Sequence, residues 1–324
     1  MTRTRRDFLM LTAAACALPR LARAAAGDTY PSRPVRLLVG FAAGGAADLN
    51  ARLVGERLST RLGQQFVVEN RVGAGGNIAT EEVVRAAPDG YTLLNCASAN
   101  AINATLYTNL NFEFAKDIAP VALCLRFPNV LLLNPSVPAK TVEEFIGYAK
   151  ANPNKINFGS AGNGTAEHLA GEMFKMMTGA EMTHVPYRGG APAMTALLGG
   201  QVQAYFCVSS TALTGVKSGM RPLAVTTASR WSGLPDVPAL GEILPGYDVS
   251  TWYGIGAPAK TSCEIIAKLN AEINAALADP AIQGRIAEIG AITTPMTDAQ
   301  FGAFIAADTE KWAKVIRTAN ITSG

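Results

Sequence analysis

Apolar and polar positions in the first hundred residues alternate in a way that predicts strands and helices in turn. Short apolar runs at residues 35–39, 65–70 and 91–96 are typical of buried strands. The stretches between them carry apolar residues at helical spacing, such as Leu49, Leu53 and Leu58 after the first run. Strand–helix–strand–helix–strand in this order predicts right-handed crossovers and therefore a parallel sheet.

The middle of the chain repeats this pattern. Strands are predicted at residues 155–159, 182–186, 203–208 and 221–226, with helices at 165–178 and 192–198 between the first three.

Thr165 is the expected N-cap of the first of these helices, and Leu169, Met173 and Met176 are expected on its buried face. A second unit of this kind predicts a second lobe.

Segments that connect the two lobes are also visible. Strand-like runs at 121–125 and 130–134 lead into the second lobe, and residues 251–256 return to the first. The tail reads as three helices with capping or proline start signals, at 262–278, 280–289 and 297–319.

The predicted fold class is therefore α/β, with two βα lobes joined by two crossover strands and a ligand cleft between them. This hinged, type II-like architecture is typical of periplasmic binding proteins. Residues 27–126 with 249–324 are expected to form lobe 1, and residues 127–248 to form lobe 2.

Each lobe has a glycine-rich junction between a strand and a helix, at residues 40–45 and at residues 159–165. Such a junction presents unpaired backbone N–H groups at the positive end of a helix dipole, where an anion can bind. Two of them predict two helix N-termini facing one ligand. The alternative is a pair of ordinary turns.

Other candidate residues allow two interpretations each. Ser98 and Asn100 follow the third strand, where open α/β sheets bind ligands, although they could be plain turn residues. Asp48 could cap the first helix or contact a ligand. Arg188 could be a ligand contact or a solvated charge, and Trp252 could line the cleft or seal the hinge.

The loops offer groups suited to a small carboxylate, namely backbone amides, hydroxyls, one amide side chain, one cation and aromatic surfaces. The side chains are Phe41, Ser98, Ser160, Asn163, Thr165, Tyr187, Arg188, Ser209 and Trp252.

The formal charge of +3 comes from the N-terminus. Residues 1–26 contain five arginines and one aspartate, so the remaining residues are close to neutral and carry no nucleic-acid footprint. Thr4-Arg5-Arg6-Asp7-Phe8-Leu9, the apolar run after it and the small residues before Gly27 predict a twin-arginine signal peptide over residues 1–26. Export to the periplasm is expected.

Catalytic and metal-binding patterns are absent from the sequence. Only two histidines occur: His168 is expected at a helix start and His184 in a strand, and a Ser160–His168 pair looks geometrically implausible. No metal-ligand spacing or nucleotide phosphate loop is present, so no metal, no cofactor and no enzymatic activity are expected. The cysteines after the signal are Cys96, Cys124, Cys207 and Cys263, which favour buried free thiols, with one disulfide as the alternative.

Several motifs together resemble the Bug family, the extracytoplasmic solute receptors of tripartite tricarboxylate transporters. They run in order over essentially the whole chain after the signal. The motifs are Phe41-Ala-Ala-Gly-Gly-x-x-Asp48, Glu69-Asn-Arg-Val-Gly-Ala-Gly-Gly-Asn77, Ala87-Pro-Asp-Gly-Tyr-Thr-Leu-Leu94, Gly159-Ser-Ala-Gly-x-Gly-Thr165, His168-Leu-Ala-Gly-Glu172, Val185-Pro-Tyr-Arg-Gly189 and Trp252-Tyr-Gly254.

The resemblance implies a receptor that closes on a small carboxylate, held by the two glycine-rich loops. It places the following positions at the ligand: Phe41, Ala43, Gly44, Asp48, Ser160, Ala161, Gly162, Asn163, Gly164 and Thr165, with Ser98, Tyr187, Arg188 and Trp252 around the cleft. Cys207-Val208 stands where the family usually has an aspartate and a small or amide residue, which disfavours an amino-acid ligand.

Three functions remain open. A monomeric receptor could deliver a carboxylate to membrane transporter subunits, a binding module could report the ligand to a sensor kinase, or a secreted enzyme could act on a small acid. The missing catalytic groups argue against the enzyme. The ligand itself, whether a dicarboxylate, tricarboxylate, amino acid, aromatic acid or amide, is not specified by the sequence.

Overall fold

The computed structural model describes residues 30–187 and 189–322. Its strands are β1 Val35–Val39, β2 Phe66–Asn70, β3 Thr92–Ala97, β4 Ile118–Leu133, β5 Asn157–Ser160, β6 Thr183–Pro186, β7 Ala204–Val208, β8 Arg221–Val225 and β9 Ser250–Pro258. Its helices are α1 Ala46–Leu62, η1 Ala74–Gly76, α2 Asn77–Val84, α3 Ser98–Leu106, α4 Phe114–Asp117, α5 Val142–Ala151, α6 Ala166–Thr178, α7 Gly190–Leu198, α8 Ser209–Lys217, α9 Leu240–Ile243, α10 Cys263–Leu277, α11 Pro280–Glu288 and α12 Asp298–Thr318.

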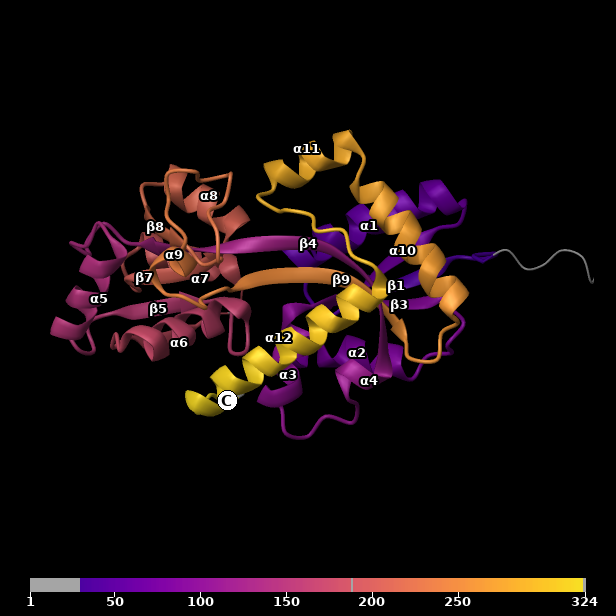
Figure 1. The fold of residues 1–324 in the computed structure, drawn as a ribbon, viewed down its shortest axis with the longest axis horizontal. Helices are drawn as coiled ribbons and strands as arrows, with labels where there is room; N and C mark the ends of the chain where they lie inside the picture. The colour runs from indigo at the N-terminus through magenta and orange to yellow at the C-terminus, as the bar shows by residue number, and fades with distance from the viewer. Residues whose placement is uncertain (1–29, 188, 323–324) are drawn as a thin grey trace, which may run out of the picture.

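Two lobes share two long strands, β4 and β9, which run side by side through the middle of the molecule (Figure 1). The sheet order is β2-β1-β3-β9-β4-β7-β5-β6, and β8 also pairs with β4. We call the half built on β1, β2 and β3 lobe 1, and the half built on β5, β6, β7 and β8 lobe 2. The predicted α/β, two-lobed fold is confirmed, including the parallel pairing of β1 with β2 and β3.

The connection into lobe 2 differs from the prediction of two separate strands at 121–125 and 130–134. The structure has one strand of 16 residues, β4. Polar residues interrupt the apolar run because they have partners there: Arg126 donates to the Ser250 hydroxyl on β9. β4 pairs with β9 through Pro128 and with β7 from Asn129. This change of partner lies two residues after the domain boundary expected at 126/127.

Asn129 ties the strands together at the point where β4 changes partner. Its side chain is fully buried, donates to the carbonyl of Phe206 on β7 at 3.2 Å and accepts from Thr251 on β9 at 3.2 Å. Its carbonyl accepts from the backbone amide of Thr226 at 2.8 Å. One buried asparagine therefore links both crossover strands to lobe 2.

Helix α12 lies across both lobes, as the yellow segment in Figure 1 shows, and it contacts both α3 and α6. Beneath it, Asp308 accepts from the indole N–H groups of Trp252 at 2.8 Å and Trp312 at 3.0 Å, and it pairs with Lys311. Both tryptophans are fully buried in a core that contains residues of both lobes.

Four local predictions were wrong or incomplete. Residues 98–106 and 209–217 form helices that the sequence did not predict, because their small and polar side chains give only a weak apolar period. Met176 is 40% exposed instead of buried, because it lies on the outer face of α6, whereas its neighbour Met177 packs against the core. Cys263 is exposed at the first position of α10; it and the buried Cys96, Cys124 and Cys207 are free thiols.

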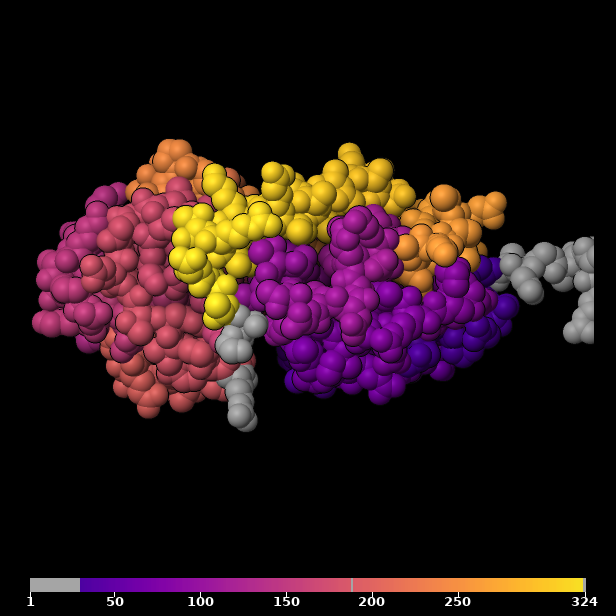
Figure 2. Space-filling view, turned by 90° about the horizontal axis from the view of Figure 1, so that it is seen from below, coloured from indigo at the N-terminus to yellow at the C-terminus, as the bar shows by residue number. Residues whose placement is uncertain are grey.

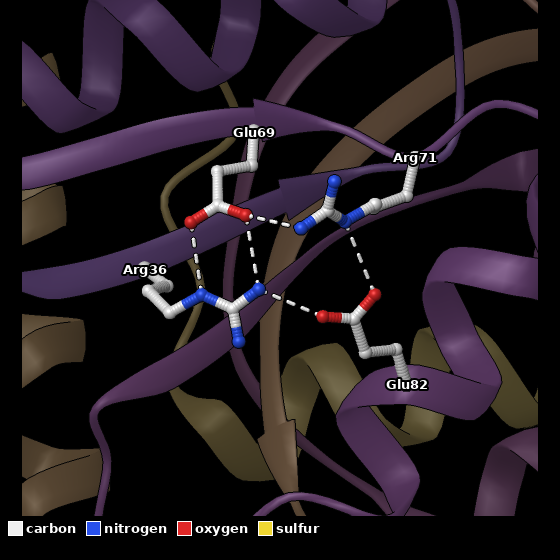
Figure 3. A network of polar contacts seen from close by, with 4 residues as sticks. All are labelled: Arg36, Glu69, Arg71 and Glu82. Carbon is white, nitrogen blue, oxygen red and sulfur yellow. Dashed lines mark hydrogen bonds and ion pairs between the residues drawn. The ribbon is translucent and has the colours of Figure 1, made fainter.

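A network of four charged side chains braces the loop that follows β2 (Figure 3). Arg36 makes two bonds of 2.9 Å to Glu69 and one of 2.7 Å to Glu82 on α2. Arg71 contacts the same two carboxylates, at 2.8 and 3.2 Å. Isolated pairs this exposed contribute little, but a closed network of this kind fixes the geometry of the loop it spans.

No helix in the described residues is long and apolar enough to cross a membrane. The predicted signal peptide, residues 1–26, lies outside the part of the chain that the structure describes.

Candidate functional site

The direction of the strands brings the loops of the two lobes face to face. β3 runs antiparallel to β9, and β7 runs antiparallel to β4, while β4 and β9 are antiparallel to each other. β1 and β2 run parallel to β3, and β5 and β6 run parallel to β7. The carboxyl ends of the strands in each lobe therefore point toward the other lobe. Figure 2 shows a furrow between the two lobes at the lower edge of the view, with the C-terminal helix crossing them at the opposite edge.

The helices that start at these carboxyl ends differ from the others in their caps. Five of these helices have an N-cap residue that makes no side-chain hydrogen bond to the helix. The N-cap residues are Gly45 for α1, Gly76 for α2, Ala97 for α3, Gly189 for α7 and Val208 for α8. Among the described helices that start elsewhere, the long ones, α5, α10, α11 and α12, are all capped by a threonine, serine or aspartate side chain, whereas the four-residue helices α4 and α9 are not. An uncapped N-terminus leaves N–H groups available to an external acceptor. α6, capped by Thr165 as predicted, is the exception at the facing edge.

In lobe 1, Asp48 organises the loop between β1 and α1. Its carboxylate accepts from the Gly44 amide at 2.9 Å, from the Asn70 side chain at 3.0 Å and from Arg52 at 2.8 Å. These bonds, that from Arg52 above all, lower the pKa of Asp48 to about 2 against the opposing effect of its burial. Asp48 is 3% exposed, so its carboxylate fixes the loop from behind.

The loop after β2 lies directly against this one. A Cβ added to Gly40 would lie 2.5 Å from the Cα of Gly76, so only glycine permits the approach. The ring of Phe41 covers Gly76, and the backbone carbonyl of Phe41 accepts from the Asn70 side chain at 2.9 Å. The N-terminus of α2 therefore joins the loop of α1 at the site. The sequence analysis placed no residue of 71–77 at the ligand, although the three glycines of this segment were a usable signal.

The two polar residues after β3, Ser98 and Asn100, are both buried. Asn100 accepts from the Ala97 amide at 2.8 Å and donates to Thr80 at 2.8 Å. Ser98 is the first residue of α3 and is 2% exposed. Asn103, which sequence reasoning missed, donates to the Gly75 carbonyl and to Asn77 and so holds the α2 loop in place.

In lobe 2, the loop at residues 160–165 is held from within. Ser160 is fully buried, and its hydroxyl accepts from the Gly162 amide at 3.1 Å. Thr165 donates to the Gly162 carbonyl at 2.8 Å and accepts from the His168 amide at 3.3 Å. Within the part of the chain that the structure describes, the loop amides of Asn163 and Ala166 have no acceptor, whereas the Ala161 and Gly164 amides donate to side chains.

Two histidines support this loop from below, a role that sequence reasoning missed. His184 Nε2 lies 2.6 Å from the Ser160 hydroxyl, and His168 Nδ1 accepts from the Gly164 amide at 3.3 Å. The two rings stack with centroids 3.8 Å apart. Burial lowers the pKa of His168 to about 4 and that of His184 to about 3, so both are neutral near pH 7. Ser160 therefore pairs with His184, which lies on the adjacent strand β6, and not with His168.

Glu167 is a second buried acid behind a loop, and it also escaped sequence reasoning. It accepts from the Ala161 amide at 2.5 Å and from the Tyr205 hydroxyl at 3.1 Å. Burial raises its pKa to about 7. Each glycine-rich loop thus gives one amide to a carboxyl group from the first turn of the helix that follows it, as Gly44 does to Asp48.

The remaining candidate ligand residues lie in different parts of the structure. Tyr187 stays beside the loop, with its amide bonded to the Ser160 carbonyl at 3.0 Å. Ser209 is fully buried and donates to the Gly290 carbonyl at 2.6 Å, which makes it a contact between the lobes. Trp252 is fully buried under α12 and presents no surface to a ligand. Arg188 lies outside the described residues.

The loops of the two lobes already touch at one point. Gly164, with a φ of +73°, approaches Leu106 at the end of α3 so closely that an added Cβ would lie 2.3 Å from the leucine Cδ2. No cluster of three or more His, Cys, Asp or Glu side chains that could hold a metal ion occurs within residues 30–187 and 189–322.

Two lobes with facing, uncapped helix N-termini define a solute-binding protein. A family model described as "Tripartite tricarboxylate transporter family receptor" matches residues 50–321. The chain therefore belongs to the receptor family of tripartite tricarboxylate transporters, and the suspected family is confirmed.

Comparisons with individual relatives support the same family assignment. The Bordetella pertussis protein BugT is 36% identical over 301 residues, which cover 92% of this chain and 92% of BugT. The solved structure of R. palustris Rpa4515 with adipate is 37% identical with a TM-score of 0.83, covering 90% of this chain and 99% of that one. MatC from Rhodopseudomonas palustris with bound malate is 31% identical with a TM-score of 0.79, covering 89% and 100%.

Proposed function

We propose that this protein is a periplasmic receptor that binds a small carboxylate between its lobes and delivers it to the membrane subunits of a tripartite tricarboxylate-type transporter. One observation carries the proposal: among the described helices, five of the six that begin at the facing strand ends lack side-chain caps, α6 being the exception, whereas the long helices elsewhere have them. Free N–H groups at a helix N-terminus suit a carboxylate, which can accept several hydrogen bonds at once.

The proposed ligand contacts are backbone amides of the loop before α1 and the amides of Asn163 and Ala166, with Phe41 and Tyr187 beside them. Ser98 at the start of α3 and Arg188 remain proposed contacts. Gly44, Asp48, Asn100 and Ser160 act from behind by shaping the loops. Ser209 and Trp252 belong to the contact between the lobes and to the core.

The relatives with solved ligands support the chemical class. Adipate and malate are both small dicarboxylates, and they occupy receptors that share this chain's fold over about nine-tenths of its length. A dicarboxylate could place one carboxylate at each loop, which would favour closure of the lobes. Export through the twin-arginine signal is part of the proposal and rests on residues 1–26 alone.

A ligand screen tests the proposal. Thermal shifts and isothermal titration calorimetry would be measured with adipate, malate, citrate, benzoate and glutamate, and with adipamide as the uncharged counterpart of adipate. We expect at least one carboxylate to bind with a stoichiometry of one. A ligand at a hundred times its Kd adds about 2.7 kcal/mol of stability, a shift that is easily measured.

Adipamide is the matched control, because it keeps the length and the carbonyl groups of adipate but lacks the charges. Binding of adipamide as tight as that of adipate would contradict recognition by helix N-termini. Failure of every carboxylate to bind would contradict the proposed function.

A further inference from the structure

Glu167 occupies an unusual place for a carboxyl group, in the first turn of α6, where we propose that an anionic ligand binds. It is the second residue of α6 and is 4% exposed. One carboxyl oxygen accepts from the Ala161 amide of the loop and the other from the Tyr205 hydroxyl on β7. The side chain therefore fixes the loop while adding a potential negative charge to it.

The described titratable groups that face Glu167 do not balance that charge. They are Tyr205 and Cys207 on β7 and Tyr253 on β9, and burial raises the pKa of all three, so they are neutral near pH 7. His168 on the same helix and His184 on β6 are neutral there as well, since burial lowers their pKa values. Burial without a cationic partner raises the pKa of Glu167 to about 7.

A ligand carboxylate at the free amides of Asn163 and Ala166 would share one helix N-terminus with the Glu167 carboxyl. Asn163 lies two residues after Ala161, whose amide Glu167 already holds, and Ala166 directly precedes Glu167. Two carboxylates at one site repel each other, and one of them then retains a proton. The ligand is in contact with solvent when it arrives, so the buried group is the one that takes up the proton.

We propose that Glu167 is a proton-linked positioning residue of the ligand site, which holds the 160–165 loop in either protonation state and becomes protonated when an anionic ligand binds. The inference rests on the proposed function, because it requires the ligand carboxylate to lie at this loop. The proton comes from solvent and joins one carboxyl oxygen. The other oxygen continues to accept the Ala161 amide, and the new O–H donates to the Tyr205 oxygen, which reverses that hydrogen bond.

This arrangement determines whether the affinity for the ligand rises or falls with pH. Binding that takes up a proton weakens as the pH rises through the pKa of the free protein. If the ligand raises the pKa of Glu167 from about 7 by roughly one unit, the affinity falls about sixfold between pH 6.5 and pH 8.5. Calorimetry at pH 7 in two buffers of different ionisation enthalpy should then detect uptake of about 0.4 proton for each ligand bound.

The experiment uses adipate and malate, which are dianions over this whole range. We expect wild type to show the loss of affinity and the proton uptake. E167Q, whose amide keeps both hydrogen bonds and resembles the protonated acid, should bind with the same affinity at pH 6.5 and 8.5 and take up no proton. E172Q is the matched control: it removes a carboxylate from the same helix, five residues further on, where Glu172 pairs with Lys175. It should keep the wild-type pH profile.

The outcomes separate the two proposals. Binding by wild type with a flat pH profile and no proton uptake would overturn the role of Glu167 and leave the receptor function intact. A pH profile that persists in E167Q, or that E172Q also flattens, would equally overturn it. If no carboxylate binds at any pH, the receptor function fails, and this inference fails with it. The proton count on wild type needs no variant, so it decides even if E167Q does not fold.

Discussion

At the scale of single residues, acidic side chains in this protein act by shaping the backbone around them. Asp48, Glu167 and Asp308 are each 6% exposed or less. The first two bind amides of the glycine-rich loops, and the third binds two indole N–H groups beneath α12. A buried carboxyl with fixed donors of this kind orders the groups around it, and removing one partner leaves the others unpaired.

Trp252 provides a test of this interpretation, because the sequence allowed it to be either a cleft residue or a structural one. We expect Trp252→Phe to lower the free energy of unfolding by about 1.5–3 kcal/mol, since an aromatic ring is kept but the hydrogen bond to the Asp308 carboxyl group is lost. Urea denaturation measures this change.

The affinity for adipate or malate should remain within about twofold of wild type, because Trp252 is fully buried away from the facing loops. Loss of ligand binding by Trp252→Phe with an unchanged free energy of unfolding would contradict the structural role and indicate that Trp252 contacts the ligand.

The sequence was sufficient for some of these residues and insufficient for others. Thr165 was predictable as a cap because the signal is local: the residue lies directly before a helix and bonds an amide three residues on. The pairing of Ser160 with His184 was not predictable, because it depends on the register of β5 against β6, which places two residues 24 positions apart side by side. The role of Glu167 was not predictable for a similar reason, since its partner Tyr205 is on strand β7, distant in the sequence.

At the scale of elements, the uncapped helices carry the functional argument. α1 begins at Gly45, whose backbone is extended at φ −81° and ψ 171°, a conformation open to any residue. A Cβ there would meet only the Ala42 carbonyl, at an ordinary 3.6 Å. Glycine is therefore not required for the turn at this position, and a good capping residue could stand there without strain.

Gly45→Asp should consequently weaken ligand binding without disturbing the fold. An aspartate at this position accepts the free amides of the first turn of α1 and repels a bound carboxylate. We expect the affinity for adipate or malate to fall at least about tenfold, equivalent to about 1.4 kcal/mol, while the free energy of unfolding stays within about 1 kcal/mol of wild type. Calorimetry and urea denaturation measure the two quantities.

Thr141→Asp is the control, because it places the same charge at the N-cap of α5, which already has a side-chain cap and does not begin at a facing strand end. Equal losses of affinity in the two variants would show a general effect of charge and contradict a ligand at α1.

Element prediction succeeded where apolar periodicity was strong and failed where it was weak. α10, α11 and α12 were expected within two residues of their observed bounds, since each combines an apolar face with a cap or proline start. α3 and α8 consist mostly of small and polar residues. These two helices form because tertiary contacts and the end of a buried strand impose them, an influence that a short window of sequence does not contain.

At the scale of the whole molecule, the two lobes are joined by β4, β9 and the core beneath α12. The sequence indicated two crossovers but divided β4 in two, because Arg126 and Asn129 interrupt its apolar pattern. Those polar residues are the ones that bind the neighbouring strands at the hinge. In the closure of the lobes that the proposed function requires, we expect these strands to bend while they remain paired, with Asn129 holding their relative positions.

Asn129→Ala should for this reason weaken both stability and binding. Removing its side chain leaves the Phe206 carbonyl and the Thr251 hydroxyl without a partner, so we expect a loss of about 1–3 kcal/mol in the free energy of unfolding. A looser hinge also lets the lobes sample more orientations, and a ligand that bridges them must then restrict more freedom. We expect the affinity for adipate or malate to fall about fivefold, with a smaller ligand-induced decrease in radius of gyration in small-angle scattering.

Asn134→Ala is the matched control for the hinge, because Asn134 follows the same strand and is also buried. Its side chain contacts only lobe 2, donating to the Leu197 carbonyl at 2.7 Å and accepting from the Ser136 amide at 2.9 Å. The two variants should lose similar stability, but Asn134→Ala should bind like wild type. Equal affinities in both variants would mean that the hinge strands impose no constraint on closure, and that the lobes are oriented by their facing loops and by α12 alone.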